Sequence, residues 1–268
     1  MKSGNRTGYA GNKNYAPVAI ARIAVPACRE PMEGKAMNQH VIEHPPLDYE
    51  AARQRMVDAQ IRPAQVNDPR VIAAMRRVPR ELAAPESLRE FAYADQSLPL
   101  PDGRALTEPR VIARMLQTAA PREGERVLVV AAGTGYLVAL TCTMQEGLRI
   151  DAVESDTTLA AIGQSLCRTF APDVSWHIGP LSAGLAGDAP YDLILIDGAV
   201  RAIPQAIVAQ CAPDGRIVAP VWPEGGVASV CIVTPTKDGS ATSTIFDANV
   251  PLLPELAPAP AFSFEAYA

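Results

Sequence analysis

The chain has 268 residues, of which 48% are hydrophobic and 20% charged, and its formal net charge at pH 7 is −5. This length and composition predict a folded α/β domain with appendages and exclude general disorder. The acidic charge argues against a nucleic-acid partner, and the lack of any apolar run of roughly 18 to 20 residues argues against a membrane span. Five cysteines without CxxC spacing predict a reducing compartment, the cytoplasm, and three histidines without ligand spacing predict no metal site. The oligomeric state is left open.

The first 46 residues lack the apolar spacing of a helix or strand. Gly, Asn and Pro interrupt them, and the best apolar run, residues 16–28, contains two prolines and an arginine. We therefore expect a disordered extension over residues 1–46. The interrupted run excludes a secretory signal, whereas a transit peptide and a start of translation at Met37 remain alternatives.

Helical patterns follow the extension. Residues 48–56, 68–78 and 110–118 carry helical signals, and Asp68-Pro69 supplies an N-cap and a first-turn proline. Prolines punctuate a loop-rich connection over residues 79–109. We therefore expect a helical lobe before the main sheet.

From Gly124 onward, strand and helix patterns alternate. The predicted strands are 126–131, 149–154, 174–178, 193–197 and 216–220, and the predicted helices are 137–144, 157–170 and 204–211. This alternation is typical of an α/β fold with a doubly wound, mostly parallel sheet. Residues 228–234 and 242–246 flank Lys237-Asp238-Gly239, which predicts a C-terminal antiparallel hairpin, and residues 254–268 are predicted to form an extended tail.

A ligand-binding pattern lies at the first predicted strand. Val127-Leu-Val-Val-Ala-Ala-Gly-Thr-Gly-Tyr136 is typical of a buried strand, a glycine turn and the start of a helix. Gly133 and Gly135 would let a ligand approach the main chain. Glu154 ends the next strand, where a carboxylate can accept hydrogen bonds from ribose hydroxyls. The loop and the acid together predict a ribose-containing ligand.

The spacing of the loop separates two cofactors. A dinucleotide fingerprint needs a third glycine where this chain has Val138. The S-adenosylmethionine type, acid-x-Gly-x-Gly-x-Gly, fits at Gly133 and Gly135, with Ala131 and Val129 replacing the first glycine and the acid. We therefore expect S-adenosylmethionine rather than NAD.

Several ordered motifs are similar to those of one family. They are Arg53-Gln-Arg-Met-Val-Asp-Ala-Gln-Ile-Arg62, Asp68-Pro-Arg-Val-Ile-Ala-Ala-Met75, Phe91-Ala-Tyr-Ala-Asp95, Ala105-Leu-Thr-Glu-Pro109, the glycine loop, Tyr191-Asp-Leu-Ile-Leu-Ile196 and Pro213-Asp-Gly-Arg-Ile-Val-Ala-Pro220. Over residues 53–253 the chain resembles the protein-L-isoaspartate O-methyltransferases. The resemblance implies a Rossmann-like methyltransferase fold and a protein-repair enzyme that uses S-adenosylmethionine to methylate the carboxylate of an isoaspartyl residue in a protein or peptide.

The resemblance also implies a division of the chain and a set of site residues. Residues 47–120 would form a substrate lobe and residues 121–253 the cofactor-binding sheet. Thr107 stands where the family has a serine and would orient the acceptor carboxylate, or it would simply cap the helix that starts at Pro109. The candidate cofactor-binding residues are Ala131, Gly133, Gly135, Tyr136, Glu154 and Asp197.

Three positions depart from the family or carry two interpretations. Pro180 replaces the family's acid that would meet the adenine amino group. Asp197 would point into the ligand crevice at the end of its strand, or it would cap the following turn. Tyr136 would cover the cofactor, or it would pack in the core.

Two other functions remain as alternatives. The replacements Val129, Ala131 and Pro180 favour a catalytically degenerate relative that acts as a nucleoside-binding or protein-binding module. An NAD-linked oxidoreductase is disfavoured because the third glycine is missing. Binding of S-adenosylmethionine or of NAD would distinguish these functions.

Overall fold

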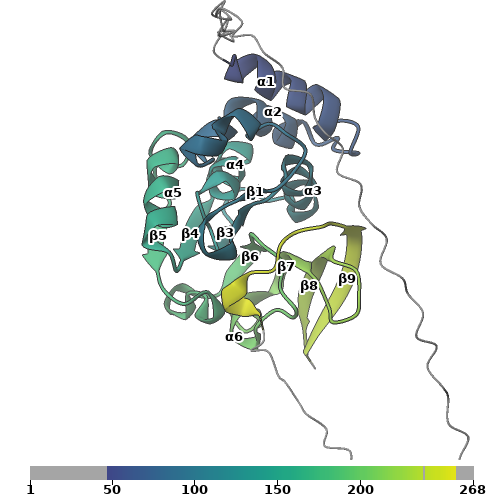
Figure 1. Ribbon diagram of the computed structural model, residues 1–268. Helices are drawn as coiled ribbons and strands as arrows, with labels where there is room; N and C mark the ends of the chain where they lie inside the picture. The colour runs from purple at the N-terminus through teal and green to yellow at the C-terminus, as the bar shows by residue number, and fades with distance from the viewer. Residues whose placement is uncertain (1–46, 238, 258–268) are drawn as a thin grey trace, which may run out of the picture. The chain divides into compact units, whose positions relative to one another are not determined.

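The structure, a computed structural model, describes residues 47–237 and 239–257 (Figure 1). The expectations for the extension over residues 1–46 and for residues 258–268 lie outside this range. Within it, no helix is long and apolar enough to cross a membrane.

The helical lobe forms where the capping signals predict it. Helix α1 (Tyr49–Met56) begins at Asp48, whose carboxylate accepts from the Ala51 amide at 2.9 Å, and it continues as a π-helical turn over residues 57–61. Helix α2 (Pro69–Arg77) begins at Asp68, which accepts from the Arg70 amide. Helix α3 spans Pro109–Ala119. These bounds confirm the three predicted helices.

The main sheet has seven strands in the order β5-β4-β3-β6-β7-β8-β9. Strands β3 (Arg126–Val130), β4 (Arg149–Glu154), β5 (Ser175–Ile178), β6 (Tyr191–Ile196) and β7 (Cys211–Val221) pair in parallel. Strands β8 (Ser229–Thr236) and β9 (Gly239–Asp247) add the antiparallel hairpin at the β7 edge (Figure 1). The predicted doubly wound, mostly parallel sheet with a terminal hairpin is confirmed.

Helices cover both faces of the sheet because its central strands are apolar on both sides. Val127 and Val129 of β3 pack in one cluster with residues of α2, α3, α4 (Tyr136–Met144) and α5 (Thr157–Phe170). Leu128 and Val130 pack in a second cluster with Ile207 of α6 (Gln205–Val208). The alternation of one strand therefore divides the core into two layers.

The predicted helix over residues 204–211 is wrong at its C-terminal end. Helix α6 is a single turn that stops at Val208, and Cys211 already pairs with Tyr191 as the start of β7. The side chain of Gln210 donates to the carbonyl oxygens of Ala183 and Ala206, which fixes the chain between helix and strand. Tertiary pairing thus overrides the local helical pattern.

The connection between α2 and α3 is more ordered than its prolines predict. It contains short 3-10 turns and a two-stranded ladder of β1 (Leu98–Pro99) with β2 (Ala105–Leu106). The buried guanidinium of Arg80 donates to the carbonyl oxygens of Ala92 at 2.8 Å and Leu106 at 3.4 Å. This side chain ties the connection to the lobe and places residues 104–108 beside the sheet.

The segment after the hairpin returns to the sheet. The Ala199 amide donates to the Pro251 carbonyl at 3.0 Å, and the Leu253 amide donates to the Ala199 carbonyl at 2.8 Å. Residues 254–256 then form a 3-10 turn, drawn in yellow in Figure 1, so the predicted extended tail is wrong for these residues. The Leu253 side chain, just before this turn, occupies the space that a Cβ at Gly198 would fill.

Candidate functional site

The candidate site lies at the carboxyl ends of β3, β4 and β6. The chain leaves β3 toward β4 and β5 on one side, whereas β6 and β7 lie on the other, so the order of the strands reverses between β3 and β6. Ligands bind in the crevice outside such a reversal. The glycine loop follows β3, Glu154 ends β4, and Asp197 follows β6. The fold therefore brings the three predicted elements to one edge of the sheet.

The loop after β3 has three residues in the left-handed region, with φ of +59° at Ala131, +54° at Gly133 and +78° at Gly135. A Cβ at Gly135 would lie 2.7 Å from the Cα of Gly163, so this glycine allows the loop to pack on α5. A Cβ at Gly133 would meet only the Ala131 carbonyl at 3.7 Å and the Arg104 guanidinium at 3.9 Å within 4 Å. Gly133 therefore faces Arg104, whereas Gly135 is needed for the close packing of the loop against α5.

Glu154 is fully buried and accepts five hydrogen bonds from nitrogen donors. Its Oε1 accepts from Arg104 Nη1 at 2.8 Å and from the amides of Ser155 and Asp156. Its Oε2 accepts from Arg104 Nη2 at 3.0 Å and from the Gly133 amide at 2.6 Å. Burial opposes ionisation, but the hydrogen bonds and charge of Arg104 outweigh it and hold the pKa of Glu154 below its ordinary value. Glu154 is therefore a carboxylate at neutral pH.

Arg104 is the residue of this site that the sequence analysis missed. Its side chain is 5% exposed, and besides Glu154 it donates to the Ala131 carbonyl at 3.1 Å. The Glu255 carboxylate lies 3.9 Å from its Nη1. The only signal in the sequence was its place three residues before Thr107, in the motif that resembles the family's substrate loop.

Thr107 and Asp197 form a second buried pair. The Thr107 hydroxyl donates to Asp197 Oδ1 at 2.8 Å. Helix α3 is capped by Glu108 without a side-chain bond, so the alternative that Thr107 caps this helix is wrong. Burial raises the pKa of Asp197 to about 6, against the lowering effects of the Thr107 hydrogen bond and the Arg104 and Arg80 charges. Asp197 therefore changes protonation close to neutral pH.

Tyr136 has the contacts of a core residue. Its ring is 1% exposed, its hydroxyl lies 3.6 Å from the Met75 sulfur, and the Arg80 guanidinium lies 5.0 Å from the ring centre. These contacts join α4 to the helical lobe. A role of Tyr136 in covering the cofactor remains a prediction.

Two further features surround the crevice. The Gly179 amide donates to the Glu154 carbonyl, and Pro180 starts a 3-10 turn, so the loop after β5 lies beside Glu154. The Thr134 hydroxyl in the glycine loop is buried and has no hydrogen-bond partner among the described residues. Such an unpartnered hydroxyl is a reason to expect a ligand at this loop. In residues 47–237 and 239–257, no cluster of His, Cys, Asp or Glu is arranged to hold a metal ion.

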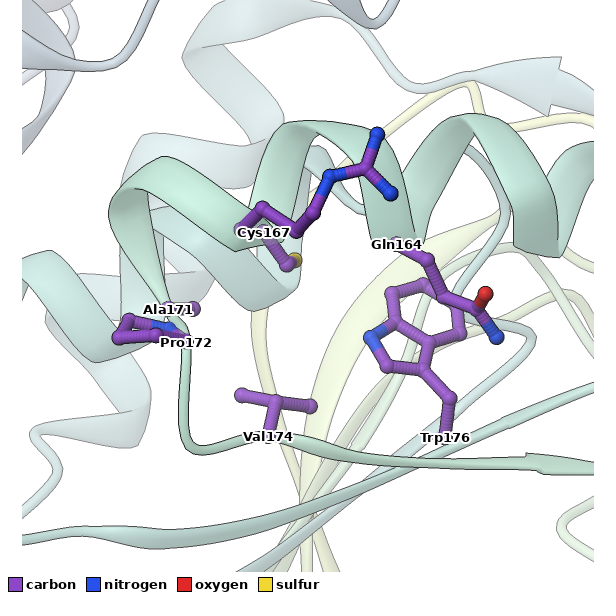
Figure 2. A pocket seen from close by; sticks show the side chains of 7 residues that line it. Gln164, Cys167, Ala171, Pro172, Val174 and Trp176 are labelled. Atoms are coloured by element: carbon purple, nitrogen blue, oxygen red, sulfur yellow. The ribbon is translucent and has the colours of Figure 1, made fainter.

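A hollow of about 310 Å³ between α5 and the segment that leads into β5 is separate from the crevice (Figure 2). Gln164, Cys167, Val174 and Trp176 are among its lining residues. Burial raises the pKa of the Cys167 thiol to about 12, which leaves it unreactive at neutral pH. None of the candidate site residues lines this hollow.

Comparisons with known proteins identify the family. The family model of protein-L-isoaspartate(D-aspartate) O-methyltransferase (PCMT) matches residues 51–248. The protein-L-isoaspartate O-methyltransferase of Methylorubrum extorquens (strain PA1) is 39% identical over 182 residues, which are 68% of this chain and 79% of that protein. The enzyme of the same name from Aeropyrum pernix is 39% identical over 194 residues, covering 71% of this chain and 74% of that protein.

Solved structures agree in fold. One protein-L-isoaspartate O-methyltransferase superposes with a TM-score of 0.65 at 20% identity, over 76% of this chain and 67% of its own. A Plasmodium falciparum protein described as a PCMT in complex with S-adenosyl-L-homocysteine gives a TM-score of 0.65 at 17% identity, over 76% of this chain and 98% of its own. Because the family model matches residues 51–248 and two relatives are 39% identical over 68% and 71% of this chain, the chain belongs to the protein-L-isoaspartate(D-aspartate) O-methyltransferase family.

Proposed function

We propose that this protein transfers a methyl group from S-adenosylmethionine to the carboxylate of an isoaspartyl residue in a protein or peptide. Family membership supports the reaction. The single structural observation that carries it is Glu154, a buried carboxylate at the end of β4 that accepts from the amide of Gly133 in the glycine loop. This is the arrangement in which a sheet of this type holds a ribose.

The residues of the crevice suit the cofactor. The Glu154 carboxylate would accept from the ribose hydroxyls, and the loop from Ala131 to Gly135 would lie against the nucleoside. The buried, unpartnered hydroxyl of Thr134 offers one more polar contact at this loop. When bound, the cofactor supplies a methyl group on a sulfonium, which a carboxylate can attack.

The protein's own part in the reaction is positioning. An aspartate-type carboxylate has an ordinary pKa near 4, so it is ionised at neutral pH without a general base. Thr107 remains our candidate to orient the acceptor carboxylate, and its hydroxyl now donates to Asp197. To reach the acceptor, the Thr107 hydroxyl would either break its hydrogen bond to Asp197 or position the acceptor through Asp197. Catalysis then rests on the alignment of acceptor and donor.

The alternative of a degenerate binding module gains no support from the comparisons, since the matched relatives carry the enzyme's name. The replacement at Val129 is accommodated structurally, because the side chain is buried in the core cluster on the α4 face. We also infer a cytoplasmic location, for which the scattered cysteines of the sequence are the support.

Transfer of labelled methyl to an isoaspartyl peptide, compared with the same peptide containing ordinary aspartate, tests the proposal. We expect label in the isoaspartyl peptide alone. Glu154→Ala should abolish transfer, whereas Glu224→Ala, at an exposed position outside the crevice, should leave it unchanged. Equal labelling of both peptides would refute the isoaspartyl specificity, and labelling of neither would refute the activity.

A further inference from the structure

The Glu154 carboxylate has no acceptor capacity left for a ribose. A carboxylate offers about four lone-pair sites, and this one already accepts five hydrogen bonds from nitrogen donors and one from the Ser155 hydroxyl at 3.3 Å. Three come from the backbone amides of residues 133, 155 and 156, which are fixed by the fold. The Ser155 hydroxyl is shared with Glu255, and the other two bonds come from the Arg104 side chain, which can rotate away. Arg104 is therefore the group that a ribose diol would replace.

Arg104 is held in this position by a small cluster of groups. Its guanidinium donates to both oxygens of Glu154 and to the Ala131 carbonyl. The Glu255 carboxylate lies 3.9 Å away and hydrogen-bonds the Ser155 hydroxyl. The turn before β2 also touches the C-terminal segment, because a Cβ at Gly103 would lie 3.2 Å from Pro254. The cluster therefore joins the 79–108 connection, the end of β4 and residues 254–256.

We propose that Arg104 is a latch on the cofactor site. It occupies the hydrogen-bonding positions of Glu154 that the ribose hydroxyls require, and it leaves Glu154 when the nucleoside binds. The proposal rests on the proposed function, because it assumes an adenosyl cofactor in this crevice.

Glu255 gives the released guanidinium a partner. Its side chain is 42% exposed, compared with 0% for Glu154, so an Arg104 side chain paired with Glu255 would lie closer to solvent. The bidentate pair with Glu154 is charge-assisted, whereas ribose hydroxyls are neutral donors. Breaking the pair therefore reduces the apparent affinity for the cofactor, and Arg104 sets that affinity.

Calorimetric binding of S-adenosylhomocysteine to three proteins tests the latch. Arg104→Met removes the guanidinium and should lower the Kd at least about fivefold relative to the unmodified chain. Arg110→Met is the matched control, because Arg110 is half exposed and pairs with Glu108 and Asp95. Its Kd should match that of the unmodified chain. An equal or higher Kd for Arg104→Met would overturn the latch, because Arg104 would then support Glu154 or the ligand.

A second comparison isolates the ribose hydroxyls. We expect the 2′,3′-dideoxy analogue of S-adenosylhomocysteine to lose little affinity in the unmodified chain and about tenfold or more in Arg104→Met, since only there is Glu154 free. Equal losses in both proteins would overturn the latch. Circular dichroism checks that Arg104→Met is folded. If it is not, Arg104→Gln replaces it in both comparisons. Absence of binding by every variant and by the unmodified chain would refute the proposed function and the latch together.

Discussion

Asp197→Asn should change the stability of the protein in a way that depends on pH. Asp197 is buried, and burial raises its pKa from the ordinary 3.8 to about 6. The groups that face it are the Thr107 hydroxyl and the Arg104 and Arg80 guanidinium groups, which lower the pKa, and Glu154, which raises it. The substitution keeps the size of the side chain and an oxygen that can accept from Thr107. It removes the buried charge alone.

The direction follows from proton binding. Below pH 3.8 the carboxyl is protonated in both folded and unfolded chains and has no effect. Between 3.8 and about 6 the folded chain binds more protons, so the free energy of unfolding falls as the pH rises, and above 6 the whole penalty applies. The gap between 3.8 and about 6, at about 1.4 kcal/mol for each pH unit, gives about 3 kcal/mol. Asp197→Asn should recover that amount at neutral pH.

Urea unfolding at pH 4, 5, 6 and 7.5 measures the effect. We expect the free energy of unfolding of the variant, minus that of the unmodified chain, to rise by up to about 3 kcal/mol from the lowest to the highest pH. Asp214→Asn is the matched control, because it makes the same replacement at an exposed position. Other titrating groups are common to both proteins and largely cancel. A constant difference across the range for Asp197→Asn would refute the reasoning.

Three further substitutions test the crevice. Ala131→Gly should raise the free energy of unfolding by about 1 kcal/mol, because Ala131 has a φ of +59°. The urea midpoint should rise with an unchanged slope, and a lower midpoint would contradict this. Thr107→Val should leave the Kd for S-adenosylhomocysteine within about twofold and lower kcat, and an unchanged kcat would remove Thr107 from the reaction. Pro180→Asp should make the free energy of binding more favourable by about 1 to 2 kcal/mol in calorimetry, because the aspartate restores an acceptor for the adenine amino group. The φ of −65° at this position suits aspartate. Unchanged affinity would place the adenine elsewhere.

The sequence predicted the parts of the fold that depend on local signals. Asp48 and Asp68 mark helix starts through side-chain oxygens, and the structure shows both accepting backbone amides. The carboxyl ends of β3, β4 and β6 meet because parallel strands bring their ends to one edge. The glycine loop, Glu154 and Asp197 could therefore be placed together from the order of the predicted strands alone.

The contacts of Arg104 could not be predicted in the same way. They depend on the path of residues 79–108, where prolines remove periodicity and leave no local pattern to interpret. That path is fixed by long-range contacts, chiefly the buried Arg80 bonded to the carbonyl oxygens of Ala92 and Leu106. The same holds for Cys211, whose pairing with Tyr191 decides between helix and strand. Only tertiary contacts carry this information.

The two carboxylates of the crevice link ligand binding to protons. Arg104 pairs directly with Glu154, but it affects Asp197 only through its charge, which lowers the pKa of Asp197. Release of Arg104 from Glu154 would weaken that lowering and move the pKa of Asp197 from about 6 toward neutral pH. Release also removes the largest lowering effect on the pKa of Glu154, which keeps the amides of residues 133, 155 and 156 as hydrogen-bond donors. Ligand binding should therefore be accompanied by proton uptake, and Asp197→Asn measures the part of it that belongs to Asp197.

S-adenosylhomocysteine is the suitable probe, because it lacks the sulfonium charge that would replace the guanidinium. Calorimetry near pH 6.5 in two buffers of different ionisation enthalpy counts the protons exchanged. We expect a fractional uptake by the unmodified chain and a smaller one by Asp197→Asn, because an asparagine at this position cannot take up a proton. Arg104→Met should also show little uptake, since its Asp197 has lost the guanidinium before the ligand arrives. Equal uptake by the unmodified chain and Asp197→Asn would show that another group binds the proton. It would refute the inference that release of Arg104 raises the pKa of Asp197.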